Sequence, residues 1–343
     1  MELHAPQYYA SFRCLAGECP HTCCAAGWEI PVDPGTAKLY EILPDALGEQ
    51  VRGFLELDPE GEPCFPLRGG VCPFLNGEGL CRIHIEHGEK ATPLICRTHP
   101  RFSYDYGPLR EQGLCGSCPE AARLILSGDM ELTVRREDGT GEETPPLLSP
   151  LLAARKTALQ LVSAETSLAQ NLQALLLFAN EVQVLLDEGQ MEAVPRLCAL
   201  YEENFPLLSG VSLPRREEVL GRCLDILEGL AILQPQWRDL LAAARGRSPA
   251  PPPDRMGERC AAYFLYRHWL RGVWDGDVLS WAEFAALGTA VSHLLGPLHP
   301  EGFPGAFRLL CQELEHSEDN MTALQDALWD SLSLPDLLSI ANL

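Results

Sequence analysis

The chain has 343 residues, which at roughly 100–200 residues per domain allows two or three domains. Hydrophobic residues make up 46% of the chain and charged residues 22%, so we expect folded cores and not a disordered polymer. The formal net charge of −22 repels nucleic-acid phosphates and anionic lipids; it attracts lysine-bearing proteins or simply keeps the protein in solution.

The first part of the chain, residues 1–136, is expected to be an irregular cysteine-rich module with short helices. Gly and Pro separate its short apolar segments, as in Asp33-Pro34-Gly35. Apolar spacing predicts helices over Ala37–Leu47 and Pro119–Leu126, and a strand over Met130–Arg135. Residues 137–150 are polar and contain Gly and Pro, so we interpret them as a linker.

Residues 151–343 show apolar spacings of three, four and seven, which predict an all-α helical domain. The expected helices are one or two over Leu151–Glu188, then Pro195–Asn204, Arg215–Leu233, Trp237–Arg245, Arg255–Trp274, Ser280–Leu295, Phe303–His316 and Asp319–Leu332. A Pro-rich loop at 246–254 is interpreted as an extended connection. The predicted fold class is therefore mainly α, with a metal module fused to a helical domain.

No segment indicates membrane insertion or secretion. The longest apolar run, near Leu172–Leu186, contains polar residues and is shorter than the ~20 residues of a membrane span. Residues 1–9 lack a basic patch followed by an apolar stretch, so no secretory signal is visible. We therefore expect a cytoplasmic protein that binds neither membranes nor nucleic acid.

Ten of the fourteen cysteines lie within residues 1–118. Cytosol is reducing, so this density favours metal binding over disulfides. Thiolates are soft ligands that suit zinc or iron–sulfur clusters, and a purely structural zinc site with His21, His84, His87 or His99 as mixed ligands stays open. The remaining four, Cys198, Cys223, Cys260 and Cys311, stand singly in helical patterns and are interpreted as core residues.

Several segments share one pattern: Phe12-Arg13-Cys14, Cys19 with Cys23-Cys24, Cys72-Pro-Phe-Leu, Leu80-Cys81-x-Ile, and Ile95-Cys96-Arg-x-x-Pro-Arg. Others are Cys24-Ala-Ala-Gly-Trp-Glu-Ile, Ser117-Cys118-Pro-Glu-Ala-Ala-Arg, Glu315-His316-Ser-Glu-Asp-Asn, and Tyr263–Asp277. Together they resemble the flagellin lysine-N-methylase family, which carries a metal-chelating cysteine-cluster motif. The resemblance covers both ends of the chain.

The resemblance implies methyl transfer from S-adenosylmethionine to the ε-amine of flagellin lysines. It also implies an iron–sulfur cluster of the 4Fe–4S type, with zinc as the alternative metal. The cysteines on motif positions, and thus the implied metal ligands, are Cys14, Cys19, Cys23, Cys24, Cys72, Cys81, Cys96 and Cys118. Cys64 and Cys115 lie outside the motif positions. Eight cysteines exceed the four ligands that one cluster needs.

Methylation of lysine requires a neutral amine, whose unperturbed pKa is ~10.4. Glu315 and His316 are candidates for the catalytic proton acceptor. The competing interpretation is a hydrated helix end, with the next helix capped by Glu318, Asp319 or Asn320. The acidic run Glu313, Glu315, Glu318 and Asp319 is a further candidate, for electrostatic capture of a lysine-bearing protein.

Three residues are candidates for binding S-adenosylmethionine. Trp28 can line the sulfonium by a cation–π contact, and Arg97 and Arg101 flank Cys96, where they can pair with a donor carboxylate or with cluster charge. Core packing and surface salt bridges are the competing roles. No Gly-rich strand-to-helix turn is visible, so a doubly wound donor-binding fold is not expected.

Two alternatives to a methyltransferase remain open. One is a non-enzymatic zinc- or iron–sulfur-binding protein in which the metal module presents a helical scaffold to a partner. The other is a redox iron–sulfur protein. The sequence does not determine the metal, its exact ligands, the target lysines or the oligomeric state.

Overall fold

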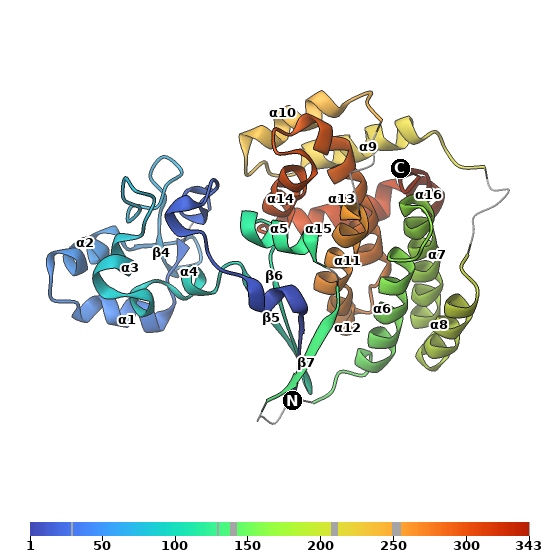
Figure 1. Cartoon of the computed structure of the whole chain (residues 1–343), viewed down its shortest axis with the longest axis horizontal. Helices are drawn as coiled ribbons and strands as arrows, with labels where there is room; N and C mark the ends of the chain where they lie inside the picture. Colours follow the sequence, from blue (N-terminus) through green and yellow to red (C-terminus); the bar gives the residue numbers. More distant parts are fainter. Residues whose placement is uncertain (29, 129, 138–142, 207–211, 249–254, 343) are drawn as a thin grey trace. The chain divides into compact units, whose positions relative to one another are not determined.

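A computed structural model describes the whole chain except residues 29, 129, 138–142, 207–211, 249–254 and 343 (Figure 1). It contains two compact units. Unit 1 consists of Met1–Ser11, Ser103–Ser117 and Ala122–Leu343, and unit 2 of Phe12–Phe102 and Cys118–Ala121. The division therefore differs from the expected one at 1–136, 137–150 and 151–343, because three N-terminal stretches pack with the helical half.

Unit 1 is mainly helical. Its α-helices are α6 (Leu148–Val162), α7 (Leu168–Asp187), α8 (Val194–Glu203), α9 (Arg216–Gly229), α10 (Pro235–Ala244), α11 (Met256–His268), α12 (Gly272–Asp275), α13 (Leu279–Leu295), α14 (Gly302–Leu314), α15 (Glu318–Ser331) and α16 (Leu334–Ile340). The short 3₁₀ helices are η1 (Gln7–Ser11), η5 (Met191–Ala193), η6 (Trp269–Arg271) and η7 (Gly296–Leu298). Helix α5 (Pro119–Ser127) begins in unit 2 and ends in unit 1.

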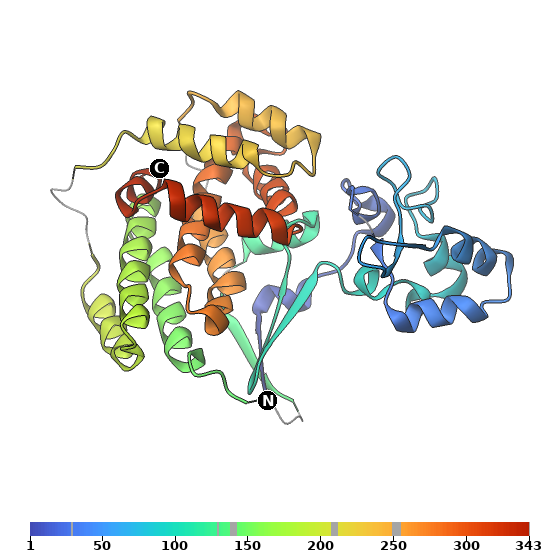
Figure 2. The same cartoon turned by 180° about the vertical axis from the view of Figure 1, so that it is seen from behind.

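Helix α13 forms the centre of unit 1. Every residue from Ser280 to Leu295 is buried, as expected for a helix that is apolar on all sides. It contacts α7, α11, α14 and α16, while α6, α7 and α8 lie side by side (Figure 1). From behind, α16 packs against α7 and α9 (Figure 2). None of the helices in the described part of the chain combines the length and hydropathy that a bilayer span requires.

The predicted helices of residues 151–343 are confirmed within a few residues, with one correction. The segment Leu151–Glu188, expected as one or two helices, forms two, because Ser167 and Gln170 make a capping box that begins α7. The segment Arg255–Trp274 is broken after α11 by η6. Helix α16 was not predicted, although Ser333 caps it and Pro335 lies in its first turn.

The helical half packs with a four-stranded sheet from residues 2–136, so unit 1 is not all-α, although the described residues of 151–343 form helices and no strand, as predicted. The strands of the sheet are β1 (Glu2–Pro6), β5 (Arg101–Tyr106), β6 (Leu109–Leu114) and β7 (Leu132–Arg136), in the order β5-β6-β1-β7. β1 runs parallel to β6, with Glu2 opposite Leu109, and antiparallel to β7, with Leu3 opposite Arg135. β7 confirms the strand predicted at Met130–Arg135. Helix α6 begins at Leu148, before the expected end of the linker at residue 150. Residues 138–142 of that linker and 249–254 of the expected Pro-rich loop lie outside the described residues.

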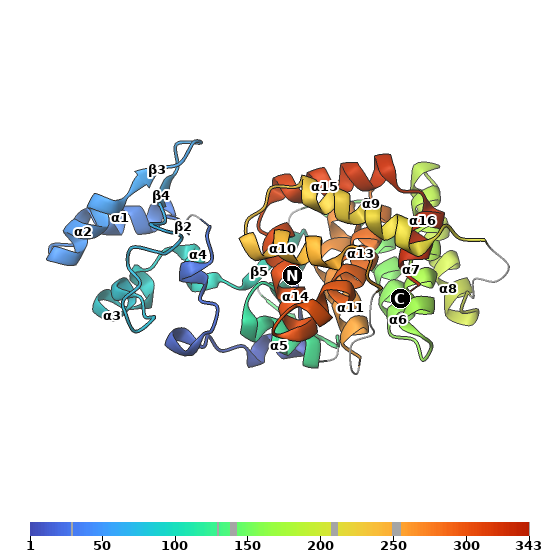
Figure 3. The ribbon, with the colours of Figure 1, turned by 90° about the horizontal axis from the view of Figure 1, so that it is seen from above.

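Unit 2 consists of short elements around a small core (Figure 3). They are η2 (Ala16–Glu18), η3 (Cys23–Ala25), β2 (Ile30–Pro31), α1 (Pro34–Ile42), α2 (Ala46–Phe54), β3 (Glu56–Leu57), β4 (Pro63–Phe65), α3 (Arg82–His87), η4 (Glu89–Ala91) and α4 (Leu94–Thr98). The helix predicted over Ala37–Leu47 is instead two helices, because Asp45 accepts a hydrogen bond from the Gly48 amide and begins α2. Phe65 and Phe74 meet edge to face at 4.9 Å in the core.

Candidate functional site

All eight cysteines expected as metal ligands lie in unit 2, on the short elements and loops that surround its core. The amide of Cys72 donates to the carbonyl of Cys24 at 2.7 Å, which joins two segments that are 48 positions apart. A bridge between Leu75 and Cys81 closes the next turn, and Cys81 then begins α3. Turns and short helices therefore present these thiols: Cys23 and Cys24 lie in η3, and Cys96 lies in α4.

The motif cysteines affect one another's pKa values in two groups. The pKa of Cys96 is raised to about 12 by burial and by the charges of Cys24, Cys72 and Cys81. Burial raises the pKa of Cys118 to about 11, and Cys19 and Cys14 add to this effect. The hydrogen bond with Cys23 lowers the pKa of Cys24 to about 6, although burial opposes it.

The chemistry of this donor set suits an iron–sulfur cluster or zinc, since thiolates bind both. The arrangement is not closed around an ion. Within the described residues, no three or more Cys, His, Asp or Glu side chains are placed to hold a metal ion together. The donor chemistry therefore suits a soft metal, although the thiols of the described residues do not surround a single ion position in this arrangement.

The three residues expected to bind S-adenosylmethionine have structural contacts within unit 2. The Trp28 ring lies 5.9 Å from the His99 ring. Arg97 donates to the carbonyls of Lys90, at 2.9 Å, and Thr92, so it braces the loop before α4. The Arg101 guanidinium lies 4.8 Å from the centroid of the Phe12 ring, so Arg101 packs on this ring in a cation–π contact.

The other two predicted site residues, Glu315 and His316, lie at the C-terminal end of α14 in unit 1. The Glu315 side chain is completely buried, so the interpretation of a hydrated helix end is wrong. Tyr263 donates its hydroxyl to Glu315 at 2.8 Å, Arg267 pairs with it at 3.1 Å, and His268 Nε2 lies 2.7 Å away. Three residues of α11 thus hold this one carboxylate.

The neighbours of Glu315 favour its ionised carboxylate. Burial opposes its charge, but Arg267, His268 and Tyr263 outweigh burial and lower the pKa to about 2. Burial also lowers the pKa of His268 to about 4, so this ring is neutral and donates its proton to Glu315. With its oxygen atoms already bound, Glu315 acts as an anchor for its neighbours.

The acidic run around Glu315 does not form one exposed surface, so the expectation of a capture site there is wrong. Glu313 is 1% exposed and accepts hydrogen bonds from the amides of Leu233 and Gln234. Burial raises its pKa to about 7. The next helix is capped by Ser317, whose hydroxyl accepts from the Asn320 amide, and not by Glu318, Asp319 or Asn320.

The structure adds Cys115, which sequence reasoning left out, to Glu315 and His316. Cys115 Sγ lies 3.6 Å from Glu315 Oε2 and 3.8 Å from His316 Nε2. The Ser117 hydroxyl lies 3.1 Å from Cys115 Sγ and 2.7 Å from His316 Nε2, so it bridges the two side chains. The only sequence signal was the pair Cys115-x2-Cys118, because some 200 residues separate Cys115 from its partners.

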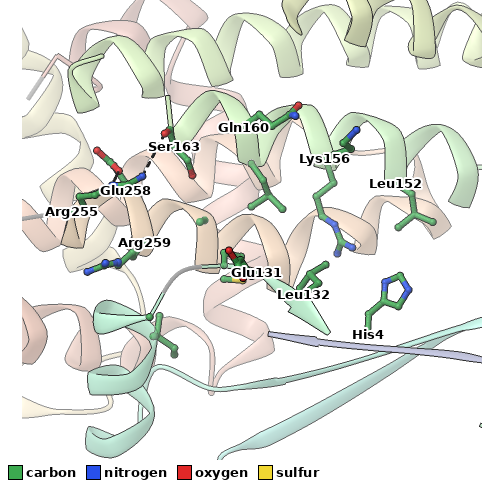
Figure 4. A pocket seen from close by; sticks show the side chains of 16 residues that line it. His4, Glu131, Leu132, Leu152, Lys156, Gln160, Ser163, Arg255, Glu258 and Arg259 are labelled. Carbon is green, nitrogen blue, oxygen red and sulfur yellow. Dashed lines mark hydrogen bonds and ion pairs between the residues drawn. The ribbon is translucent and has the colours of Figure 1, made fainter. Parts of the chain in front are cut away.

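A cavity of about 560 Å³ lies in another part of unit 1 (Figure 4). Helices α6 and α11 and strands β1 and β7 line it, and its walls combine apolar side chains with charges of both signs. Arg255 pairs with Glu258 at 2.6 Å, and Arg259 donates to the Leu126 carbonyl at 3.0 Å. Its volume is in the range of roughly 300–1,000 Å³ that is typical of small-molecule sites.

Comparison with known proteins identifies relatives. No protein-family model and no solved structure matches the chain. Over 128 residues, 36% of this chain, it is 30% identical to a lysine-N-methylase of Salmonella choleraesuis and to one of Salmonella typhimurium, and it spans only 32% of each. It is 30% identical over 128 residues to the flagellar biosynthetic protein FliU of Salmonella muenchen, and this match covers 75% of that protein. The chain therefore belongs to the family of the flagellar biosynthetic protein FliU.

Proposed function

We propose that this chain is a protein-lysine N-methyltransferase that methylates flagellin. The observation that carries the proposal is the 30% identity to proteins named lysine-N-methylase and flagellar biosynthetic protein. Since the match spans about a third of each lysine-N-methylase, the activity and the substrate are inferred from that part alone.

The cluster at the end of α14 supports the proposal because it contains groups suited to an amine. A lysine ammonium must lose a proton before its nitrogen can attack a methyl group. Glu315 is a buried anion held by Tyr263, Arg267 and His268, so its role is to fix this cluster and favour positive charge beside it. The half-buried His316 is better placed than Glu315 to exchange protons with solvent.

The cavity between α6 and α11 is the proposed site for S-adenosylmethionine, which supplies the methyl group as a sulfonium. Its amino-acid end carries both an ammonium and a carboxylate, and the cavity offers Glu131 for the first and Lys156 for the second (Figure 4). Apolar walls such as Leu132 and Leu152 suit the adenine ring. Because Trp28, Arg97 and Arg101 have structural contacts elsewhere, we place the donor in this cavity.

Unit 2 is the proposed site of the metal centre, an iron–sulfur cluster with zinc as the alternative. The support is the gathering of Cys24, Cys72, Cys81 and Cys96 around one core. Metal binding requires that the thiols lose their protons. The free energy of metal binding would then stabilise the folded state of unit 2. No step of methyl transfer is assigned to it.

The test is incubation of the anaerobically purified protein with flagellin and methyl-labelled S-adenosylmethionine, followed by mass spectrometry of flagellin lysines. Glu315→Gln should lower the rate of methyl transfer by about 100-fold, because the loss of one electrostatic or proton-transfer group in an active site has an effect of this size. Glu143→Gln, an exposed carboxylate of unit 1, is the matched control and should leave transfer unchanged. Lys156→Glu should raise the KM for the donor.

Metal content and transfer separate the proposal from its alternatives. Iron and sulfide in the purified protein, lost in Cys24→Ser and kept in Cys64→Ser, would support the cluster; Cys64 is a buried cysteine of unit 2 outside the motif. A protein that binds zinc and never labels flagellin would be a structural metal protein. Iron without methyl transfer would favour the redox alternative.

A further inference from the structure

A second cavity of unit 1, of about 340 Å³, shares no lining residue with the cavity proposed for the methyl donor. It lies where the end of α7, the end of α12 and the first turn of α13 meet Trp329 of α15. Gln183 joins these segments, because its side chain donates to the Gly276 carbonyl at 3.0 Å and accepts from the Val278 amide at 2.9 Å. Hydrogen bonds therefore fix the walls of this cavity, and its volume suits a small ligand group.

The walls of this second cavity carry negative charge and no positive charge. Asp187, Asp275 and Asp277 line it, and none of its lining residues is Lys, Arg or His. Asp187 Oδ1 accepts from the Gln183 side chain, and Asp275 Oδ1 accepts from the Asp277 amide, both at 2.9 Å. Asp187 and Asp275 are exposed, and in the described part of the chain their Oδ2 atoms bind no other group. These oxygen atoms can therefore accept hydrogen bonds from a cationic ligand.

A nearly buried carboxyl on α13 is an independent sign of a cation at this place. Leu279 lines the cavity, and Glu283 follows it by one turn on the same face of the helix. Glu283 is 8% exposed. Burial and the charge of Asp277 raise its pKa to about 8, and no hydrogen bond or positive charge of the described residues offsets them. A cation in the cavity would compensate Glu283 together with the aspartates.

Two exposed tryptophans indicate that the cation belongs to a protein. Trp329 lines the cavity and is 76% exposed, so its ring can face an ammonium group. Trp274, the neighbour of Asp275 in the chain, is 66% exposed as well. Aromatic side chains are enriched where proteins bind one another, whereas a free small cation needs no apolar surface outside the cavity. A protein segment is therefore the ligand that uses both features.

We propose that this cavity binds the ammonium of a lysine side chain on a protein partner, with Asp187, Asp275 and Asp277 as acceptors and Trp329 as the aromatic wall. The inference rests on the proposed function for the identity of the partner, flagellin, and not for the binding itself. The bound lysine is a docking contact and not the lysine that is methylated, since the cavity shares no residue with the donor cavity or with the Glu315 cluster. The net charge of −22 attracts such a partner from a distance.

The first experiment measures binding without methyl transfer. Nα-acetyl-lysine methylamide is titrated into the full chain, and its Kd is determined by ligand-observed NMR; the Nε-acetylated derivative is the neutral probe with the same backbone. We expect a millimolar Kd for the cationic probe and about tenfold weaker binding of the neutral probe. Equal binding of the two probes would overturn the proposal. A Kd of n-pentylamine, which has the same charge and no peptide backbone, roughly tenfold below that of the lysine probe would overturn the protein as the source of the cation.

Matched variants locate the binding. Asp275→Asn keeps an acceptor for the Asp277 amide, and Trp329→Ala removes a mostly exposed ring, so both should fold with an unchanged Tm. Each should raise the Kd of the lysine probe about threefold, through the loss of one ion pair or one cation–π contact. Asp239→Asn is the control, because it removes the same charge from an exposed position of α10 outside the cavity. An equal rise of Kd in Asp239→Asn and Asp275→Asn would show attraction by net charge alone and overturn the site.

Methylation assays separate this inference from the proposed function. With flagellin as substrate, Asp275→Asn and Trp329→Ala should raise KM about threefold and change kcat by less than about twofold, because docking is weakened and the chemistry is not. A wild-type protein that methylates flagellin, with KM unchanged in both variants, overturns the docking site and leaves the function intact. A wild-type protein that binds the lysine probe in this cavity and methylates no flagellin overturns the function and leaves the lysine site.

Discussion

Glu111 and Arg155 form a buried ion pair that joins strand β6 to helix α6. Arg155 Nη1 lies 2.6 Å from Glu111 Oε2. The Arg155 side chain is 3% exposed and the Glu111 side chain is 2% exposed. Arg155 also donates to the Tyr266 carbonyl of α11 at 3.2 Å. Glu111→Gln removes one charge and leaves the guanidinium buried without compensation. Such a change costs about 3–5 kcal/mol in the free energy of unfolding.

Thermal unfolding followed by circular dichroism measures this cost. At about 2–4 °C per kcal/mol for a domain of this size, Glu111→Gln should lower Tm by roughly 6–20 °C. Asp105→Asn breaks an exposed pair with Arg110 in the same sheet and should leave Tm unchanged. The double variant Glu111→Leu with Arg155→Met removes both charges and should recover most of the stability. A Glu111→Gln protein that melts within about 2 °C of the wild type would refute the reasoning.

Three further predictions concern unit 1. Burial opposes the Glu315 charge, but Arg267 outweighs burial, and the pKa of Glu315 falls to about 2. The ionised carboxylate therefore stabilises the fold fully above the unfolded pKa of ~4.3, and this stabilisation is lost as the pH falls toward 2. Acid titration followed by circular dichroism should show a smaller loss of stability between these pH values for Glu315→Gln than for the wild type. Ser317→Ala removes the cap of α15 and should cost about 1 kcal/mol in urea unfolding, whereas Ser317→Thr should cost less. Joint replacement of Cys198 and Cys223 by Ala should leave the iron content unchanged, and iron loss with an intact fold would contradict a metal centre confined to unit 2.

The sequence by itself determined the helices of unit 1, because an amphipathic helix leaves its periodicity in consecutive residues. It also placed eight cysteines in one part of the chain, and the structure gathers them in unit 2. The limits of helices were less certain where a side-chain cap decides them, as Ser167 does for α7 and Asp45 for α2. Both caps are local, yet their signal is a single residue and not a repeated pattern.

Only the tertiary structure decided the sheet, the two units and the composition of the polar cluster. Strand β1 pairs with β6 and β7, which lie more than 100 residues further along the chain. The five residues of β1 contain no pattern from which these partner strands could be predicted. Cys115 meets Glu315 and His316 across 200 residues for the same reason. Contacts of this kind follow from how helices α11 and α14 pack, and packing depends on the shape of every buried side chain at once.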